Sequence, residues 1–496
     1  MKNMKKLISV LLTLVMALAL TVPAFAAPTN TTITAPAGST RTYDVYQIFV
    51  GDLSGKVLSN VKWGENGTGT KGVPVDKTTL DALVSVNSKS DTEKLDEIEK
   101  YVSLTSTAFG TVDKDTSLTV PTGYYLIKDK GPVGDKESYS LFVVQVVGPT
   151  TISPKVGTTT SEKKVKDTND STGDTSDWQD SADYDIGDNV PFQLKATLPD
   201  NVSVYDTYKV VFHDTLSKGL TYNGDAKVYI GGTETNGFTV TTGTDEDDNP
   251  TLTISCDNVK ALNAGNGSVI TVEYTAKLNE NAVVGSTGNS NKMHLEYSNN
   301  PNNSGAGNNE TGNTPEDTVV VFTYKTIINK VTKNPDYKPG VEGSQEYIPL
   351  TGAAFKLEKK GSTGAWTTVK EFTVDSTATS FEFSGLDDGT YKLTETVTPA
   401  GYNTIDPIEF TITAAHDDSS AAPTLTSLSG NATVEEIIFT PNTTAGSLTA
   451  DVVNQAGAVL PETGGMGTTL FYILGSVLVL GAGVLLVVKK RMGADK

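Results

Sequence analysis

The sequence predicts an all-β protein made of tandem immunoglobulin-like β-sandwich domains. Short segments that alternate polar and apolar residues recur along the chain, as in 190–196 and 269–274, which is typical of strands. Clusters of Gly, Asn and Asp separate these segments, as the turns of a sandwich require. The chain has 496 residues, enough for roughly two to four domains once the terminal segments are set aside.

The N-terminus predicts export. Three lysines within the first six residues precede an apolar run at 7–22, and Ala24-Phe25-Ala26 has the small-x-small form of a secretory cleavage site. We therefore expect residues 1–26 to be a signal peptide.

The C-terminus predicts a membrane segment. The run from about 469 to 488 carries no charged residue and is followed by Lys489-Lys490-Arg491. A helix of about 20 apolar residues spans a hydrocarbon core, and the basic cluster behind it should stay cytoplasmic. The hexapeptide LPETGG at 460–465 stands immediately before this run.

The pattern of strands and polar runs divides the rest of the chain into a first β-rich domain at 27–152, a linker at 153–162, a middle domain at 163–316 and a third domain at 317–459. In the first domain, apolar residues at helical spacing within 78–101 predict one or two short helices.

Two polar stretches belong to the middle domain. The Asn/Gly-rich run at 299–315 is expected to be a loop or hinge. The acidic cluster at 245–248 lacks the loop spacing of an EF-hand, so we expect a solvated turn there rather than a calcium site.

Composition excludes several functions. The formal net charge is −20, and without clustered Lys and Arg a nucleic-acid partner is not expected. Cys256 stands alone, so no intrachain disulfide can form. His213, His294 and His416 are the only histidines, which leaves little material for Cys/His catalysis or His-rich metal sites. We expect no metal and no cofactor.

Three residues of the third domain suggest a condensation. Lys330 lies on its first expected strand, Glu395 in its middle and Asn454 on its last strand. First and last strands of a sandwich can lie side by side, so the Lys amine and the Asn amide could meet beside a carboxyl group. Burial lowers the pKa of a Lys and raises that of a Glu, which favours attack of a neutral amine on an amide polarised by a protonated acid. Residue types alone favour an ordinary surface Lys, strand Glu and turn Asn over such a trio.

The motifs around these residues resemble the Cna B-type domains and the E-box of Gram-positive pilins. They are LTGAAFKL at 350–357, YKLTETVTPAGY at 391–402, IINKV at 327–331 and VVNQ at 452–455. The resemblance implies an isopeptide bond between Lys330 and Asn454, promoted by Glu395. Thr398 stands where the E-box usually has Ala.

The middle domain is similar to the middle domains of shaft pilins, through EKKVKD at 162–167, FHDTLSKGL at 212–220 and NSNKMHLEY at 289–297. The resemblance implies a second trio, Lys163, Asp214 and Asn291. Lys164 and Asn289 are close competitors, although Lys163 shares a strand face with Val165, an expected core residue.

The first domain lacks the reactants for such a bond. Asp129 follows Gly123 by six residues, as Glu395 follows Gly389, but no Lys occurs between 27 and 49 and no Asn between 138 and 152.

The linker contains Ser153-Pro154-Lys155. This resembles the pilin motif of shaft pilins, which ends in Tyr-Pro-Lys and whose Lys accepts the next subunit; Ser153 stands in place of the Tyr. Pro154 holds the segment extended and removes a donor. A plain interdomain linker is the alternative.

LPETGG before a membrane segment resembles the sorting signal of Gram-positive surface proteins, where a sortase cuts between Thr463 and Gly464. The resemblance therefore implies a non-enzymatic shaft subunit of a covalently polymerised pilus, displayed on the cell surface and anchored to the wall. The implied partners are sortase, further copies of the chain and peptidoglycan, with minor pilins and host surface ligands also possible.

The alternatives are a basal or tip pilin, a monomeric adhesin, and a surface enzyme such as a glycosidase. A glycosidase needs two carboxylates that face each other across a cleft. No compact acidic motif in the sequence indicates such a pair.

Overall fold

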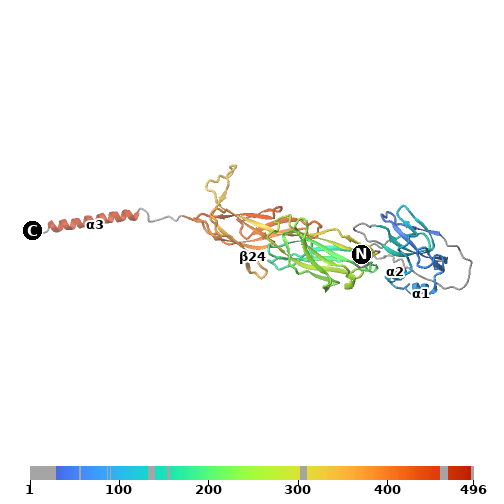
Figure 1. Cartoon of the computed structure of the whole chain (residues 1–496). Helices are drawn as coiled ribbons and strands as arrows, with labels where there is room; N and C mark the ends of the chain where they lie inside the picture. The colour runs from blue at the N-terminus through green and yellow to red at the C-terminus, as the bar shows by residue number, and fades with distance from the viewer. Residues whose placement is uncertain are drawn as a thin grey trace, which may run out of the picture.

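The computed structural model describes residues 30–54, 57–86, 88–89, 91–131, 140–153, 157–301, 310–458 and 467–492. In these ranges strands dominate, and they form three β-sheet bodies that follow one another along a line, with helix α3 beyond the third (Figure 1). The all-β sandwich prediction is confirmed.

The first body has a three-stranded sheet, β5-β1-β8, and a five-stranded sheet, β3-β2-β6-β7 with β4 beside β2. Its two short helices, at 77–85 and 91–99, lie close to the expected range of 78–101. Asp76 caps the first helix by accepting a 2.9 Å hydrogen bond from Thr79 N. The elements are β1 (Asn30–Thr34), β2 (Tyr43–Ser54), β3 (Val57–Trp63), α1 (Lys77–Ser85), α2 (Asp91–Glu99), β4 (Gly110–Val112), β5 (Leu118–Pro121), β6 (Gly123–Asp129), β7 (Leu141–Val146) and β8 (Thr150–Thr151).

The middle body is a sandwich of two sheets, β10-β21-β19-β12-β17-β16 with β20 beside β19, and β15-β14-β18-β11-β9 with β13 beside β18. Inward-facing residues alternate along its strands, as in β11 and β18, and form one core. The elements are β9 (Thr160–Val165), β10 (Ser181–Asp183), β11 (Asn189–Thr197), η1 (Val202–Val204), β12 (Val210–Leu216), β13 (Leu220–Tyr222), β14 (Lys227–Ile230), β15 (Thr233–Thr235), β16 (Thr239–Thr244), β17 (Pro250–Cys256), η2 (Val259–Leu262), β18 (Val269–Leu278), β19 (Asn289–Ser298), β20 (Thr311–Asn313) and β21 (Asp317–Phe322).

The third body is a smaller sandwich of β23-β22-β31-β30, with β26 beside β22, against β25-β24-β27-β28-β29. Its first and last strands, β22 and β31, pair in parallel. The elements are β22 (Tyr324–Lys333), β23 (Tyr347–Pro349), β24 (Ala354–Lys360), β25 (Trp366–Glu371), β26 (Ser380–Leu386), β27 (Gly389–Val397), β28 (Ile408–His416), β29 (Leu425–Ala432), β30 (Thr440–Asn442) and β31 (Ser447–Asn454).

Strand β21 differs from the expected division of the chain. The sequence assigned it to the start of the third domain, but it pairs with β19 in a sheet of the middle body. Its two faces serve two cores: Val319 and Val321 pack in the middle body, whereas Val320 and Phe322 pack in the third. The side-chain period of two makes this possible, and it joins the two bodies closely. A second difference is β20, a short strand inside the run expected to be a loop.

Helix α3 (Gly467–Met492) stands apart from the three bodies (Figure 1). Its segment Phe471–Met492 is apolar and long enough to cross a membrane, and none of it is buried against the rest of the protein. The β-sheet bodies therefore do not need α3 in order to fold.

Candidate isopeptide sites

The three candidate residues of the third body meet in its interior. Lys330 on β22 is opposite Val452 on β31, and Asn454 follows on the same face two residues later. Glu395 reaches them from β27 in the facing sheet. The side chains of Lys330 and Glu395 are fully buried, and Asn454 is 0% exposed.

One carboxylate oxygen faces both nitrogens of this trio. Glu395 Oε1 lies 3.1 Å from Lys330 Nζ and accepts a 3.0 Å hydrogen bond from Asn454 Nδ2. Lys330 Nζ also donates to Asn454 Oδ1. The amine, the amide and an acid that can carry a proton between their nitrogens are therefore in mutual contact.

The surroundings favour a neutral amine. Burial lowers the pKa of Lys330, although the negative charge of Glu395 opposes this. The Phe355 ring, with its centroid 5.5 Å from Lys330 Nζ, forms part of the apolar wall around the amine. Glu395 Oε2 accepts hydrogen bonds from Thr398 Oγ1 at 3.1 Å and Ile405 N at 3.3 Å, which fix the carboxyl group. Thr398, the departure from the usual E-box, therefore contacts the acid directly.

The middle body holds the second trio between its two sheets. Lys163 projects from β9 in one sheet, and Asp214 on β12 and Asn291 on β19 project from the other. Asn291 pairs with Leu216, two residues from Asp214, so the two side chains share a face. Lys163 Nζ lies 2.5 Å from Asp214 Oδ1, and both side chains are fully buried.

Tyr274, which sequence reasoning missed, stands between the acid and the amide. Its hydroxyl donates to Asp214 Oδ2 at 2.5 Å and accepts from Asn291 Nδ2 at 2.6 Å. Lys163 Nζ lies 3.4 Å from the same hydroxyl. Asn291 Oδ1 is buried and has no hydrogen-bond partner among the described residues. The alternation of β18 indicated an inward Tyr274, but that pattern is equally that of a core aromatic.

Burial also sets the protonation states in the middle body. It lowers the pKa of Lys163, against the opposing charge of Asp214, and raises the pKa of Asp214, against the opposing charge of Lys163. Both shifts favour the neutral amine and the protonated acid.

The competing residues are engaged elsewhere. Lys164 Nζ lies 2.5 Å from Asp180, in a partly exposed pair. Asn289 accepts from Val283 N and donates to the carbonyls of Val283 and Val321. The geometry therefore favours Lys163 and Asn291.

The first body places an arginine where a reactive lysine would be needed. Arg41 Nη1 lies 3.0 Å from Asp129 Oδ2, and both side chains are largely buried. A guanidinium stays charged and does not act as a nucleophile at neutral pH. This pair is therefore a buried ion pair.

The remaining predicted features lie outside the described residues or away from the two trios. The signal peptide, Lys155, and LPETGG with Thr463 and Gly464 lie outside the described residues. The acidic cluster forms an exposed turn in which Asp245 accepts hydrogen bonds from Asp247 N and Asn249 N. Cys256 is buried.

Known family models match three parts of the chain. A Gram-positive pilin backbone subunit 2, Cna-B-like domain model matches residues 186–301, and a prealbumin-like fold domain model matches 342–426. The LPXTG cell wall anchor motif matches 452–492. In these three parts the chain is similar to the Gram-positive backbone pilins. It is a surface protein anchored to the cell wall.

One protein sequence and two solved structures are similar to the chain. The pilin is 28% identical over 276 residues to the trypsin-resistant surface T6 protein of Streptococcus pyogenes, a match that covers 44% of the pilin and 48% of that relative. The pilin thus matches about half the length of this curated relative. Its fold is similar to the T6 backbone pilin structure of S. pyogenes, with a TM-score of 0.50, 18% identity, and coverage of 86% of the pilin and 98% of that chain. The major pilin SpaD of Corynebacterium diphtheriae matches with a TM-score of 0.43 and 16% identity, over 88% of the pilin and 99% of that chain.

Proposed function

We propose that this pilin is the shaft subunit of a covalently polymerised pilus. A sortase joins Thr463 of one subunit to Lys155 of the next, and internal bonds from Lys330 to Asn454 and from Lys163 to Asn291 stabilise each subunit. The observation that carries the internal bonds is the pair of dry sites in which a lysine amine, an acid and an asparagine amide are enclosed together.

The condensation balances without a cofactor. In the third body, neutral Lys330 Nζ attacks Cγ of Asn454, and the C–Nδ2 bond breaks. Glu395 takes a proton from Nζ and delivers one to Nδ2, because its Oε1 faces both nitrogens. Ammonia leaves, the acid is regenerated, and fixed proximity supplies much of the rate. The bond forms once per domain, so the chain is not an enzyme with turnover.

In the middle body the same proton must travel further. Asp214 contacts the amine directly but reaches the amide nitrogen through the Tyr274 hydroxyl. Protonated Asp214 can donate to the Tyr274 oxygen while Tyr274 donates to Nδ2. Tyr274 is thus a relay between the acid and the leaving group.

The proposed bonds shorten the path along which tension travels. Between Lys155 and Thr463, the two cross-links remove residues 164–290 and 331–453 from the covalent path. Most of each sandwich then carries no load. The first domain precedes Lys155 and lies outside this path, so it needs no such bond.

The alternative placements are a basal or tip subunit and a monomeric adhesin. These would use Thr463 for wall attachment but not Lys155 for chain growth. Whether Lys155 is joined to Thr463 of another subunit in cells therefore distinguishes these placements from a shaft subunit.

The intact mass of the recombinant ectodomain tests the internal bonds. We expect a mass lower than the sequence mass by two ammonia masses, with Glu395→Ala and Asp214→Ala each restoring one. Thr398→Ala is a control, since it removes one contact to Glu395 and leaves the trio complete. An unreduced wild-type mass would refute both bonds, and a single loss would identify the trio that does not react.

A further inference from the structure

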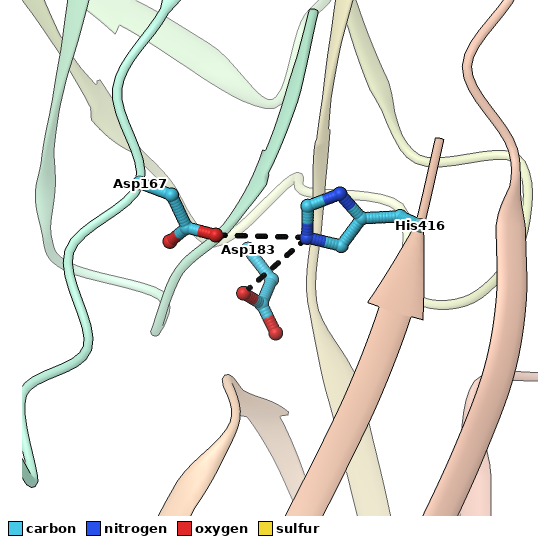
Figure 2. A group of neighbouring side chains, drawn as sticks. All are labelled: Asp167, Asp183 and His416. Carbon is cyan, nitrogen blue, oxygen red and sulfur yellow. Dashed lines mark ion pairs between the residues drawn. The ribbon is translucent and has the colours of Figure 1, made fainter. Parts of the chain in front are cut away.

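Three side chains with metal-ligand chemistry converge where the middle and third bodies meet. Asp167 follows β9, Asp183 ends β10, and His416 ends β28 of the third body (Figure 2). His416 Nε2 points at both carboxylates, 3.6 Å from Asp167 Oδ2 and 3.8 Å from Asp183 Oδ1. The three side chains are only 10%, 21% and 4% exposed for His416, Asp167 and Asp183.

The orientation of the imidazole follows from its other nitrogen. Ser181 Oγ donates its single proton to the Asp417 carbonyl at 2.6 Å, so it accepts at 2.6 Å from His416 Nδ1–H. The neutral ring then carries its lone pair on Nε2, which faces the carboxylates. A metal-binding histidine is typically held in this way by a partner on its second nitrogen.

The spacing fits a shared cation. Separations of 3.6 and 3.8 Å exceed hydrogen-bonding distance. Ligands arranged as a tetrahedron at about 2.1 Å from a zinc ion lie roughly 3.4 Å apart. A contraction of a few tenths of an ångström would therefore bring Nε2 to ligand spacing from each carboxylate oxygen, and all three ligand atoms already lie within 4.8 Å of one another.

Charge at the junction is unevenly compensated. Next to this group, Asp170, Asp185 and Asp387 surround Lys359, whose Nζ supplies a cation. Around Asp167 and Asp183 no lysine lies within ion-pair distance in the described chain, and the backbone of a further acid, Asp388, hydrogen-bonds Asp183. Of the two acidic groups, the one that lacks a lysine is therefore the one that contains His416.

We propose that His416, Asp167 and Asp183 bind one Zn²⁺ ion, or a divalent transition metal of similar size, and so tie the middle and third domains together. Water completes the coordination. A borderline-soft ion is favoured over Ca²⁺ because one ligand is an imidazole nitrogen. This site is independent of the isopeptide bonds.

A proton is the competing occupant. Burial would lower the pKa of His416, but Asp167 and Asp183 outweigh it and raise that pKa to about 9. An imidazolium paired with both carboxylates would also satisfy the site. Zinc binding distinguishes the two, since a site that holds only a proton takes up no metal.

The test uses the untagged ectodomain, stripped with a chelator and titrated with ZnCl₂ by calorimetry. We expect one saturable site, lost in His416→Asn and in Asp183→Asn. It should be weakened about tenfold in Ser181→Ala, which removes the partner of Nδ1 and leaves the three ligands in place. The matched control is the double variant His213→Asn/His294→Asn. These are the other two histidines, stacked 4.8 Å apart on β12 and β19, and the variant should retain the site.

Absence of saturable binding in the wild type would overturn the proposal and leave the proton as occupant. Binding that survives His416→Asn but is lost in the His213/His294 double variant would also overturn it. If either junction variant fails to fold, Asp167→Asn gives the same comparison at a more exposed ligand.

Discussion

Asn291 Nδ2 donates a 2.6 Å hydrogen bond to the Tyr274 hydroxyl, so the amide of the middle domain meets its acid only through a third side chain. In the third domain the corresponding contact, from Asn454 to Glu395, is direct. We therefore expect the rate of cross-linking to depend on a relay residue in the middle domain but not in the third domain.

Tyr274→Phe should slow cross-linking of the middle domain by about 10²- to 10⁴-fold, the usual contribution of a positioned proton donor. The third domain of the same molecule should react at its normal rate, which provides an internal reference. The measurement is a time course of ammonia loss by mass spectrometry, with peptide mapping to assign the bond. Tyr222→Phe is the matched control, because Tyr222 packs against Tyr274 without contacting the trio. Equal rates in Tyr274→Phe and wild type would exclude the relay.

The internal isopeptide bonds should make the middle and third domains more resistant to proteolysis than the first domain. Each would close a loop of over a hundred residues, as the separation of 124 between Lys330 and Asn454 illustrates. By analogy with a disulfide, such a closure stabilises a domain by about 4 to 5 kcal/mol. Limited trypsin digestion should therefore degrade the first domain first, and Glu395→Ala should make the third domain comparably sensitive. Survival of the first domain as the most resistant fragment would contradict the assignment.

Lys359 should be a strong determinant of stability at the junction of the middle and third domains. Its Nζ lies 2.6 Å from Asp185 and also pairs with Asp387, and only 7% of its side chain is exposed. Lys359→Met would leave buried carboxylates uncompensated, which costs about 3 to 5 kcal/mol. Thermal unfolding should show a lower midpoint for these two domains. Lys356→Met, which removes a more exposed ion pair with Glu358, should cost less than about 1 kcal/mol, and an equal effect of both variants would refute the role of Lys359.

The sequence predicted the strands and the third-domain trio because both leave local signals. Alternation marks each strand, and the segments around Lys330, Glu395 and Asn454 carry recognisable motifs. Strand pairing then brought first and last strands together as expected.

The relay and the junction leave no such signal. Tyr274 is one inward aromatic among many, and its role depends on the side chains that face it from the other sheet. Ser181 and His416 are 235 residues apart and meet only because β21 ties the two bodies together. The strand face shared with Val165 already favoured Lys163 over Lys164 in the sequence, although a shift of one residue in the strand would invert that choice.

The last prediction concerns assembly through Lys155. LPETGG places Thr463 just before the membrane helix, where a sortase can form a thioester with it through an activated cysteine. That acyl group needs an amine, and in a shaft the amine belongs to another copy of the same chain. An acceptor behind the first domain and a donor at the C-terminal end join subunits head to tail, and such a contact does not close, so a fibre grows.

In cells with the cognate sortase, Lys155→Ala should reduce the high-mass ladder on immunoblots to monomer while the protein stays on the wall through Thr463. Lys164→Ala is the matched control, because Lys164 is the nearest lysine that the internal bond does not consume, and its side chain is partly exposed. The ladder should persist in that variant. A ladder that persists in Lys155→Ala, with Thr463 found on another lysine, would show that the acceptor lies elsewhere. Monomer in the wild type would instead favour a basal subunit or an adhesin, since neither requires an acceptor lysine for chain growth.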